Sequence, residues 1–187
     1  VLSRHQAKKW LSFRSAATHQ LRQLSFCEKL TQCLERWQVP SQMFELEITE
    51  SAAMSSSEHA SRLLSDAVAR GVSLALDDFG VGHSSLGQLR ALPVTRLKLD
   101  RSFVNGVAED ERDAQMARAA IALAKGLGMM VVAEGVETQP QCSFLRQEGC
   151  HELQGWHFAP AVPPDEIPSL VKRLDQQHSQ RCLCLTE

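Results

Sequence analysis

The sequence predicts an α/β fold of alternating strands and helices, arranged either as a (β/α) barrel or as an open doubly wound sheet. Short apolar runs with strand periodicity end in polar residues, and most are followed by a stretch with helical periodicity. Because parallel strands need crossover connections, this alternation places helices outside a parallel sheet. The 187 residues are 43% hydrophobic and 22% charged, which is typical of one globular domain able to bury a core without disulfides or metals.

The first elements are weakly marked, and clearer ones begin near residue 26. Residues 10–13 are a candidate strand, although no strand and helix can be recognised before them. Residues 26–37 have a helical pattern that Val39-Pro40 breaks, because proline disfavours the helical conformation of the preceding residue. Residues 44–48 alternate with the period of a strand, and residues 58–69 repeat apolar side chains at the spacing of a core-facing helix.

Three further strands are expected in the middle of the chain. Residues 72–76, 96–99 and 130–133 are short runs of mostly apolar or β-branched residues. Residues 114–126 lie between the last two and carry apolar residues three and four positions apart, as a core-facing helix does. The spacing therefore predicts successive βα units.

The C-terminal part contains recognisable helix boundaries. Thr138 suits the N-cap of a helix through Leu145, and Gly149 is placed to end it. Residues 152–155 are expected to form the end of a further strand, and residues 165–174 a closing helix.

Polar residues stand at or just beyond the C-terminal ends of five expected strands: Glu47, Asp77 with Asp78, Lys98, Glu134 and Gln154. In parallel α/β folds these ends converge on one rim, where active sites lie. Any one of them alone would be an ordinary polar cap, but all five positions together indicate a site. Clustered carboxylates repel one another unless cations neutralise them, and oxygen ligands favour Mg²⁺, Mn²⁺ or Ca²⁺.

Two residues within this set suggest phosphodiester chemistry. Adjacent Asp77 and Asp78 could bridge two metal ions, an arrangement used for in-line attack on phosphodiesters. Lys98 would orient a metal-bound water or neutralise charge. Residues 77–80 also contain the Asp-Phe-Gly triplet of protein kinases, but no Gly-rich phosphate loop or His-Arg-Asp loop precedes them, which excludes a kinase.

Long stretches of the chain resemble the EAL-domain family of cyclic di-GMP phosphodiesterases. They are residues 45–51 (ELEITES), 77–86 (DDFGVGHSSL), 97–104 (LKLDRSFV), 131–138 (VVAEGVET) and 154–158 (QGWHF). These motifs keep the order and spacing of the family, and the resemblance covers roughly residues 15–174. It implies an incomplete TIM-like (β/α) barrel of the EAL type that lacks about two N-terminal βα units.

The resemblance also implies a metal site. Two Mg²⁺ or Mn²⁺ ions would activate water to open cyclic di-GMP to linear pGpG. Carried over by motif, Glu47 and Asp77 would bind one metal and Asp78 the second. Glu50 would brace the loop at residues 79–85, which in the family couples the metal site to dimer contacts.

The remaining roles implied by the resemblance are catalytic and substrate-binding. Lys98 would position the attacking water, and Glu134 would support the water network of the second metal. Gln154 would hydrogen-bond near the site. Asp100 and Gln154 would contact the substrate.

The sequence departs from the family at two metal ligands. The Glu-Ala-Leu motif that names the family, with its Arg two residues later, is absent from these 187 residues. The family's Asn ligand should fall near Ser15, but residues 15–21 contain no Asn and offer only His19 as a substitute. Even outer residues of metal sites typically contribute 10–100-fold to affinity or activity, so losing two ligands should cost more. We expect a degenerate domain that binds metal weakly or not at all.

Three functions remain open at this point. The chain could be a cyclic di-GMP phosphodiesterase whose site is completed by a partner chain. It could instead be a binding or regulatory module in cyclic di-GMP signalling, or a protein-interaction module. A homodimer is expected, because an incomplete barrel leaves strand edges that proteins usually cover or pair.

The sequence divides into a basic N-terminal segment (1–14), a truncated EAL domain (15–175) and a polar tail (176–187). The net charge of −2 argues against binding to nucleic acid or anionic membranes, and no apolar run approaches the about 20 residues of a membrane span. The six cysteines lack zinc-site spacing, which favours reduced thiols and a cytoplasmic location.

Overall fold

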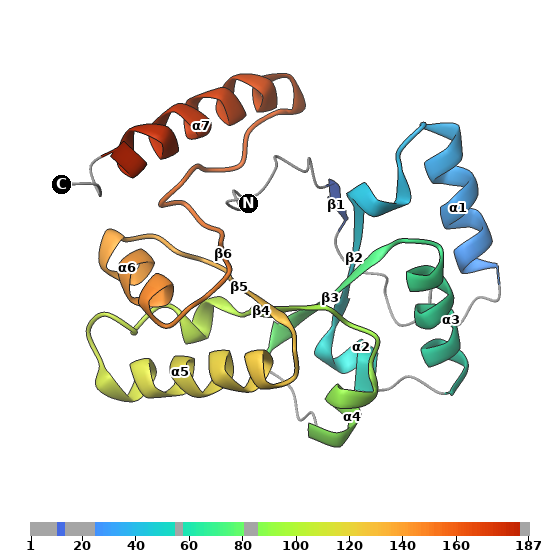
Figure 1. The fold of residues 1–187 in the computed structure, drawn as a ribbon, viewed down its shortest axis with the longest axis horizontal. Coiled ribbons are helices and arrows are strands. Elements are labelled where there is room, and N and C mark those ends of the chain that lie inside the picture. Colours follow the sequence, from blue (N-terminus) through green and yellow to red (C-terminus); the bar gives the residue numbers. More distant parts are fainter. Residues whose placement is uncertain (1–10, 14–24, 55–57, 81–85, 184–187) are drawn as a thin grey trace.

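The computed structural model of the chain describes residues 11–13, 25–54, 58–80 and 86–183, which are coloured in Figure 1. Strands and helices alternate along these residues, as the sequence predicts. The described cysteines Cys27, Cys33, Cys142 and Cys150 are free thiols. Among the described helices, none combines the length and apolar character needed to cross a bilayer.

In the part of the chain that the structure describes, six parallel strands form one sheet in the order of the chain. They are β1 (Leu11–Phe13), β2 (Phe44–Thr49), β3 (Ser73–Phe79), β4 (Arg96–Leu99), β5 (Met130–Ala133) and β6 (Glu152–Leu153). A doubly wound sheet reverses its strand order at a switch point, whereas this one does not.

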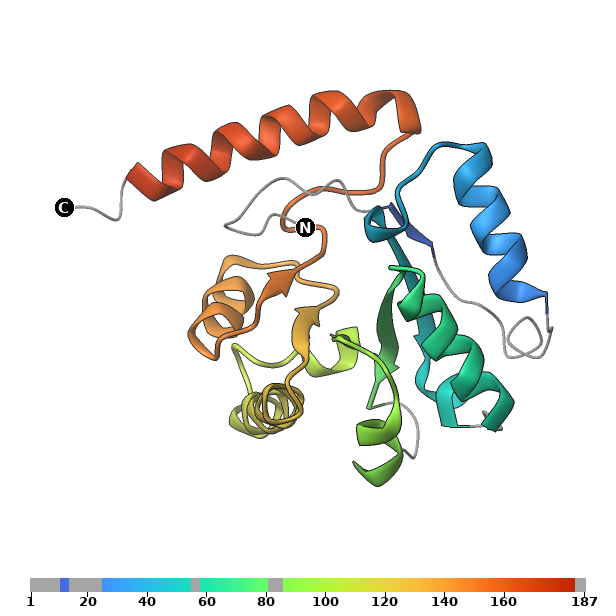
Figure 2. The same ribbon diagram turned by 45° about the vertical axis from the view of Figure 1, so that its right-hand side comes forward.

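The sheet curves, and its strands stand around a common interior in Figure 2. A closed barrel of this kind has eight strands, so the six described strands form an incomplete TIM-like barrel. The barrel alternative is therefore confirmed. Within the described residues, β1 pairs only with β2 and β6 pairs only with β5.

The helices cover the outer face of the sheet (Figures 1 and 2). Four of the longer helices lie there, α1 (Phe26–Arg36), α3 (Glu58–Ala69), α5 (Glu111–Gly126) and α6 (Gln139–Gln147), close to the expected ranges. The sequence patterns missed the shorter elements, whose one or two turns show too little of a helical period. These are α2 (Glu50–Met54), α4 (Leu86–Ala91), η2 (Ser41–Met43), η3 (Arg101–Phe103) and η4 (Pro164–Glu166).

Helix α6 begins where the sequence predicts because a capping box forms there. The Thr138 hydroxyl accepts a hydrogen bond from the Gln141 N–H at 3.4 Å, and the Gln141 side chain accepts one from the Thr138 N–H at 3.0 Å. Each bond satisfies an N–H that the first helical turn would leave without a partner. Helix α5 starts earlier than expected, since Asp110 caps it by accepting from the Arg112 N–H at 2.7 Å.

The two faces of the strands differ in chemistry. Leu74, Leu76, Leu97 and Leu99 are fully buried in the core between the sheet and its helices, and each contributes about 1.5–3 kcal/mol through burial. Because strand side chains alternate between faces, the strand residues on the opposite face point into the barrel interior. Several of those interior residues are charged and buried.

The closing helix was predicted too short. Helix α7 (Ile167–Leu183) continues well past residue 174, so residues 176–183 of the expected polar tail are helical. No glycine or proline lies in that stretch to end the helix. Both views place α7 away from the sheet, and its main contact is with the adjoining η4 (Figures 1 and 2). Residues 184–187, and residues 1–10 of the basic segment, lie outside the described residues.

Candidate functional site

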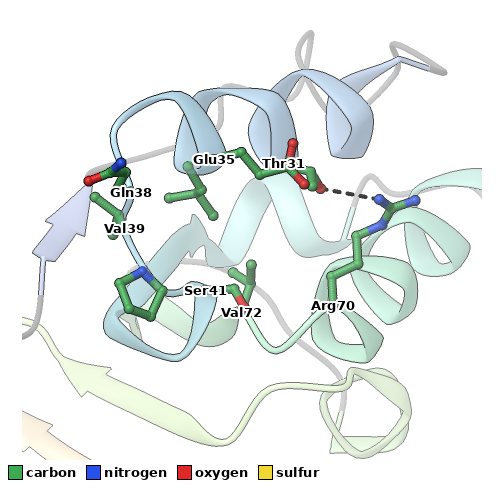
Figure 3. A pocket seen from close by; sticks show the side chains of 9 residues that line it. Thr31, Glu35, Gln38, Val39, Ser41, Arg70 and Val72 are labelled. Atoms are coloured by element: carbon green, nitrogen blue, oxygen red, sulfur yellow. Dashed lines mark hydrogen bonds between the residues drawn. The ribbon is translucent and has the colours of Figure 1, made fainter.

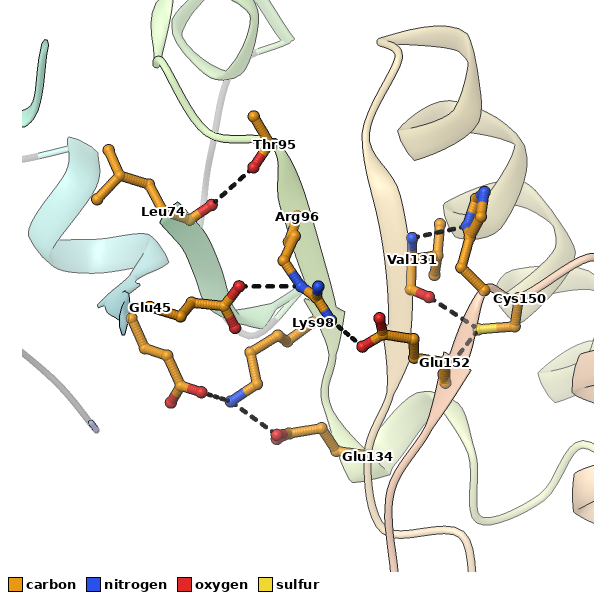
Figure 4. Close-up of polar contacts among 11 residues, drawn as sticks. Glu45, Leu74, Thr95, Arg96, Lys98, Val131, Glu134, Cys150 and Glu152 are labelled. Carbon is orange, nitrogen blue, oxygen red and sulfur yellow. Dashed lines mark hydrogen bonds and ion pairs between the residues drawn. The ribbon is translucent and has the colours of Figure 1, made fainter. Parts of the chain in front are cut away.

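The predicted rim residues converge around Lys98, near the C-terminal end of β4. Its Nζ lies 2.8 Å from Glu47 Oε1 on β2, 3.1 Å from Asp77 Oδ1 on β3 and 2.7 Å from Glu134 Oε1 just after β5. Figure 4 shows the amine between carboxylates of different strands. We call Lys98, Glu47, Asp77 and Glu134 the upper ion cluster. The ammonium group has three donors, and three carboxylates match them.

Charge and burial act against each other in this cluster. Burial disfavours a charged amine, but hydrogen bonds to Glu134 and Glu47, with the charges of Glu134 and Asp77, raise the pKa of Lys98 above its usual value. Burial raises the pKa of Glu134, while its hydrogen bond to Lys98 opposes the rise. One cation therefore stabilises several carboxylates, but it also holds these like charges close enough to repel one another.

Asp78 adds a fourth carboxylate through an unusual backbone conformation. Its φ is 53°, and the pairing of β3 with β4 shifts register between Leu76 and Phe79. Consecutive side chains of a regular strand point to opposite faces, but a bulge can re-aim one of them. Ligand oxygens of Asp77, Asp78 and Glu134 lie within 4.8 Å of one another. A strained residue of this kind costs about 1–3 kcal/mol and is typical of functional sites.

The donor set suits a divalent cation. Three carboxylates on one rim provide the oxygen ligands that Mg²⁺, Mn²⁺ or Ca²⁺ prefers. Asp77, Asp78 and Glu134 are the described residues that could hold such an ion. Glu47, which the family resemblance also implies as a ligand, lies against Lys98 instead of within this trio. Ser15 and His19, considered above at the position of the Asn ligand, lie outside the described residues.

Gln154 is held at the same rim by its backbone. Its N–H donates to the Ala133 carbonyl at 2.8 Å, and its carbonyl accepts from the Val136 N–H at 3.0 Å. The next residue is a glycine, and a Cβ there would collide with the backbone of Val136. The end of β6 is thus fixed beside the loop after Glu134, with the Gln154 side chain exposed.

Asp100 and Glu50 make backbone contacts around the rim. Asp100 Oδ1 accepts from the Ser102 N–H at 2.9 Å and caps η3. Burial opposes the effect, but hydrogen bonds from Ser102 and Arg101 lower the pKa of Asp100. Buried Glu50, at the start of α2, accepts from the Gly80 N–H at 2.9 Å and so holds the segment just after β3. Residues 81–85 of the loop that Glu50 is predicted to brace lie outside the described residues.

A second group of buried charges was missed by sequence reasoning. Arg96 Nε lies 3.0 Å from Glu45 Oε2 on β2, and Arg96 Nη2 pairs with Glu152 on β6. We call these three residues the lower ion cluster (Figure 4). Burial raises the pKa of Glu45, and Arg96 opposes the rise. Arg96 and Glu45 each precede a rim residue by two positions. Because strand side chains alternate, this spacing could have predicted that they lie on the same face of the strand as that rim residue.

A cavity of about 580 Å³ lies at the opposite end of the strands, beside α1 and the segments that lead into β2 and β3 (Figure 3). Its lining includes Thr31, Glu35, Val39 and Arg70. The Arg70 guanidinium donates to Thr31 Oγ1 at 3.1 Å and to an Asp66 oxygen at 3.0 Å, so its charge is already partnered. None of the rim residues lines this cavity.

Together, the fold and site define a TIM-like α/β protein with a buried, lysine-centred carboxylate site at the C-terminal ends of its strands. Residues 2–161 match the EAL domain family, and the chain belongs to that family. The resemblance read from the sequence motifs is therefore confirmed.

Relatives and solved structures agree with this assignment. The chain is 42% identical over 139 residues to the cyclic di-GMP phosphodiesterase NbdA of Pseudomonas aeruginosa, covering 74% of this chain and 18% of that protein. It is similar to a PaMucR phosphodiesterase solved with cyclic di-GMP, with a TM-score of 0.76, 35% identity, and coverage of 83% and 62% of the two chains. For the EAL domain of Mycobacterium smegmatis DcpA the TM-score is 0.78, at 35% identity and 87% and 71% coverage.

The chain spans less than a fifth of NbdA and less than two thirds of the PaMucR structure. The likeness therefore concerns one domain of these longer proteins.

Proposed function

We propose that these 187 residues form a degenerate EAL domain that binds a divalent cation, Mg²⁺ or Mn²⁺, together with cyclic di-GMP, and acts as a binding or regulatory module in cyclic di-GMP signalling. The observation that carries the proposal is the trio of Asp77, Asp78 and Glu134, whose oxygens lie within 4.8 Å of one another. The relatives named as cyclic di-GMP phosphodiesterases supply the ligand class.

Each rim residue has a part in binding. Asp77, Asp78 and Glu134 hold the cation, which when bound supplies Lewis-acid chemistry at a phosphate oxygen. Lys98 keeps the carboxylates of three elements together. Exposed Gln154 is available to hydrogen-bond the ligand. Asp100 takes part in ligand binding from its position after β4.

Hydrolysis by these residues alone should be weak. They include no Glu-Ala-Leu motif and no Asn near Ser15. In addition, carboxylate oxygens of Glu47, Asp77 and Glu134 already lie within 3.1 Å of Lys98 Nζ, so a water would compete with these carboxylates for the amine. Both features favour retention of the ligand over turnover.

Calorimetric titration with cyclic di-GMP, with and without Mg²⁺, tests the proposal. We expect binding that strengthens with the cation. If neither cyclic di-GMP nor the cation binds, the rim is without a ligand and a protein-interaction module is the better account. Conversion of cyclic di-GMP to pGpG by the purified chain, abolished by Asp77→Ala, would overturn the proposed lack of turnover.

An active phosphodiesterase is the second candidate, favoured by the names of the relatives. In this alternative a partner chain completes the metal site. Turnover per chain would then rise with protein concentration, whereas a degenerate domain stays inactive at all concentrations.

We also propose a homodimer. Within the described residues, the outer edges of β1 and β6 carry no neighbouring strand, and such edges are usually covered or paired. Light scattering at micromolar concentration should give twice the mass of the 20.8 kDa chain. A monomer under these conditions would contradict the dimer.

The free thiols of the described cysteines support a cytoplasmic location.

A further inference from the structure

The lower ion cluster joins strands that are not neighbours in the sheet. Arg96 on β4 pairs with Glu45 on β2 and with Glu152 on β6, and all three side chains are buried. Strands β3 and β5 lie between them. A single guanidinium therefore connects one side of the barrel interior to the other.

This contact depends on curvature. Neighbouring strands lie about 4.8 Å apart, so β2 and β6 would be about 19 Å apart in a flat sheet. Strand side chains stand roughly perpendicular to their sheet, and in a flat sheet Arg96 would not reach carboxylates two strands away on both sides. The two ion pairs exist because the interior faces of β2, β4 and β6 converge.

Each member of the cluster lies two residues before a rim residue, on the same strand in β2 and β4 and just past the strand end in β6. Glu45 precedes Glu47, Arg96 precedes Lys98 and Glu152 precedes Gln154. With the strand period of two, Glu45 and Glu47 share one face of β2, and Arg96 and Lys98 share one face of β4. Barrel interiors are built in layers contributed by alternate strands, and β2, β4 and β6 are such a set.

We propose that Arg96 is a positioning residue, which fixes the curvature of the open sheet and thereby holds Gln154, just after β6, in reach of a ligand bound at the upper ion cluster. This inference rests on the proposed binding of cyclic di-GMP. Strand β6 has two residues and pairs with only β5 in the part of the structure described, and the backbone bonds of Gln154 run to that same side. Among the described contacts, the ion pairs of Arg96 link β6 across the interior to β2. The metal trio does not depend on Arg96, since Lys98 holds Asp77 and Glu134 independently.

Stability and positioning can be separated by replacing the whole cluster. Arg96→Met alone leaves two buried carboxylates without their cation, which is strongly destabilising. The triple variant Glu45→Leu, Arg96→Met and Glu152→Leu removes all three charges, and apolar replacement of a buried ion cluster is often neutral or stabilising. The triple variant should therefore fold, but without the link between β2 and β6.

The test compares Mn²⁺ and cyclic di-GMP affinities of the full chain by calorimetry. For the triple variant we expect Mn²⁺ affinity within about threefold of the original, and cyclic di-GMP affinity lower by about tenfold or more, the usual effect of an outer residue of a site. Hydrogen exchange should be faster at the backbone amides of β6 than in the original chain, and unchanged in β2–β4.

A matched control is Arg118→Met. Arg118 also lies between two carboxylates, Glu111 and Glu148, but on the surface between α5 and α6. It should leave both affinities unchanged. A folded triple variant with undiminished cyclic di-GMP affinity would overturn the positioning role, and so would a proportional loss of both affinities. If the original chain binds neither ligand, the proposed function fails instead.

Discussion

The two ion clusters of the barrel interior have the same design but different charge. Each is centred on a cation of β4, with carboxylates from strands on both sides. The central side chains are equally buried, with 7% of Arg96 and 4% of Lys98 exposed. Burial therefore does not distinguish them, whereas the number of carboxylates does.

The lower ion cluster has one cation and two carboxylates, while the upper has one cation and three, with Asp78 beside them. Interior layers of such barrels are usually filled by apolar side chains, so both clusters are departures. The surplus negative charge of the upper ion cluster, next to the open rim, is what a divalent cation can neutralise. The lower ion cluster serves geometry, and the upper serves binding.

The largest expected effects come from removing the two central cations. Arg96→Met and Lys98→Met should each lower the free energy of unfolding by about 3–5 kcal/mol, because each leaves buried carboxylates without their partner. Urea denaturation with and without Mn²⁺ separates the two. Mn²⁺ should restore part of the stability lost in Lys98→Met, because the ion neutralises the carboxylates in place of the amine. It should restore none of the stability lost in Arg96→Met.

The surface variant Arg118→Met is the control and should change stability far less than either of these, because exposed ion pairs are screened by solvent. If Mn²⁺ restored the stability of Arg96→Met and Lys98→Met equally, the proposed difference between the two clusters would be wrong.

A second prediction concerns the surplus charge itself. Asp78→Asn should weaken Mn²⁺ binding by about tenfold or more, since it removes a ligand oxygen's charge. Asparagine tolerates the left-handed conformation at this position, so stability without Mn²⁺ should change by less than about 0.5 kcal/mol. Calorimetry and urea denaturation measure both. Asp66→Asn, at an exposed ion pair with Arg70, is the control with no effect on Mn²⁺.

A smaller effect is expected at Glu50, which links the start of α2 to the segment just after β3. Glu50→Ala removes the acceptor of the Gly80 N–H and should lower the free energy of unfolding by about 1 kcal/mol. Mn²⁺ affinity should fall as well, because Gly80 lies two residues after Asp78. Glu50→Gln keeps an acceptor oxygen and should retain most of the stability and most of the Mn²⁺ affinity. Equal losses in Ala and Gln variants would show that the charge, and not the hydrogen bond, matters.

The smallest effect is a pH dependence beside the lower ion cluster. His151 Nδ1 accepts from the Val131 N–H at 2.9 Å, and burial, followed by the charges of Lys125 and Arg96, lowers the pKa of this ring. Between the lowered pKa and the usual one, the unfolded chain binds the proton more readily, so acid destabilises the folded state. Because the ring is partly exposed, the loss should stay below about 1 kcal/mol.

Urea denaturation at pH 7 and pH 5 measures this loss. His151→Asn keeps an acceptor without titrating in this range and should lose less stability than the original chain. The comparison cancels the contributions of Glu45 and Glu134, whose raised pKa values act in the opposite direction. An identical loss in both proteins would assign the acid sensitivity elsewhere.

Much of the fold could be predicted because its information is local. The alternation at residues 44–48 and 96–99 and the apolar run at 130–133 correspond to β2, β4 and β5. The convergence of strand-end residues was also predictable, since parallel strands share one rim, and Glu47, Asp77 and Glu134 do meet at Lys98. Their chemical roles stay predictions.

The other features could not be predicted, because they depend on contacts between residues far apart in the sequence. Arg96 meets Glu45 and Glu152 only because the sheet curves, and strand periodicity alone does not specify curvature. The register shift that turns Asp78 toward the rim is likewise set by pairing with β4. Helix α7 was predicted too short because its later turns lack an apolar repeat to mark them.

The position of α7 has a practical consequence for labelling. Its 17 residues extend about 25 Å from η4, and the helix lies away from the sheet. A helix with so few contacts can fray without unfolding the barrel. A fluorescent label placed on α7 would therefore disturb few contacts of the barrel and could report the location of the chain in living cells.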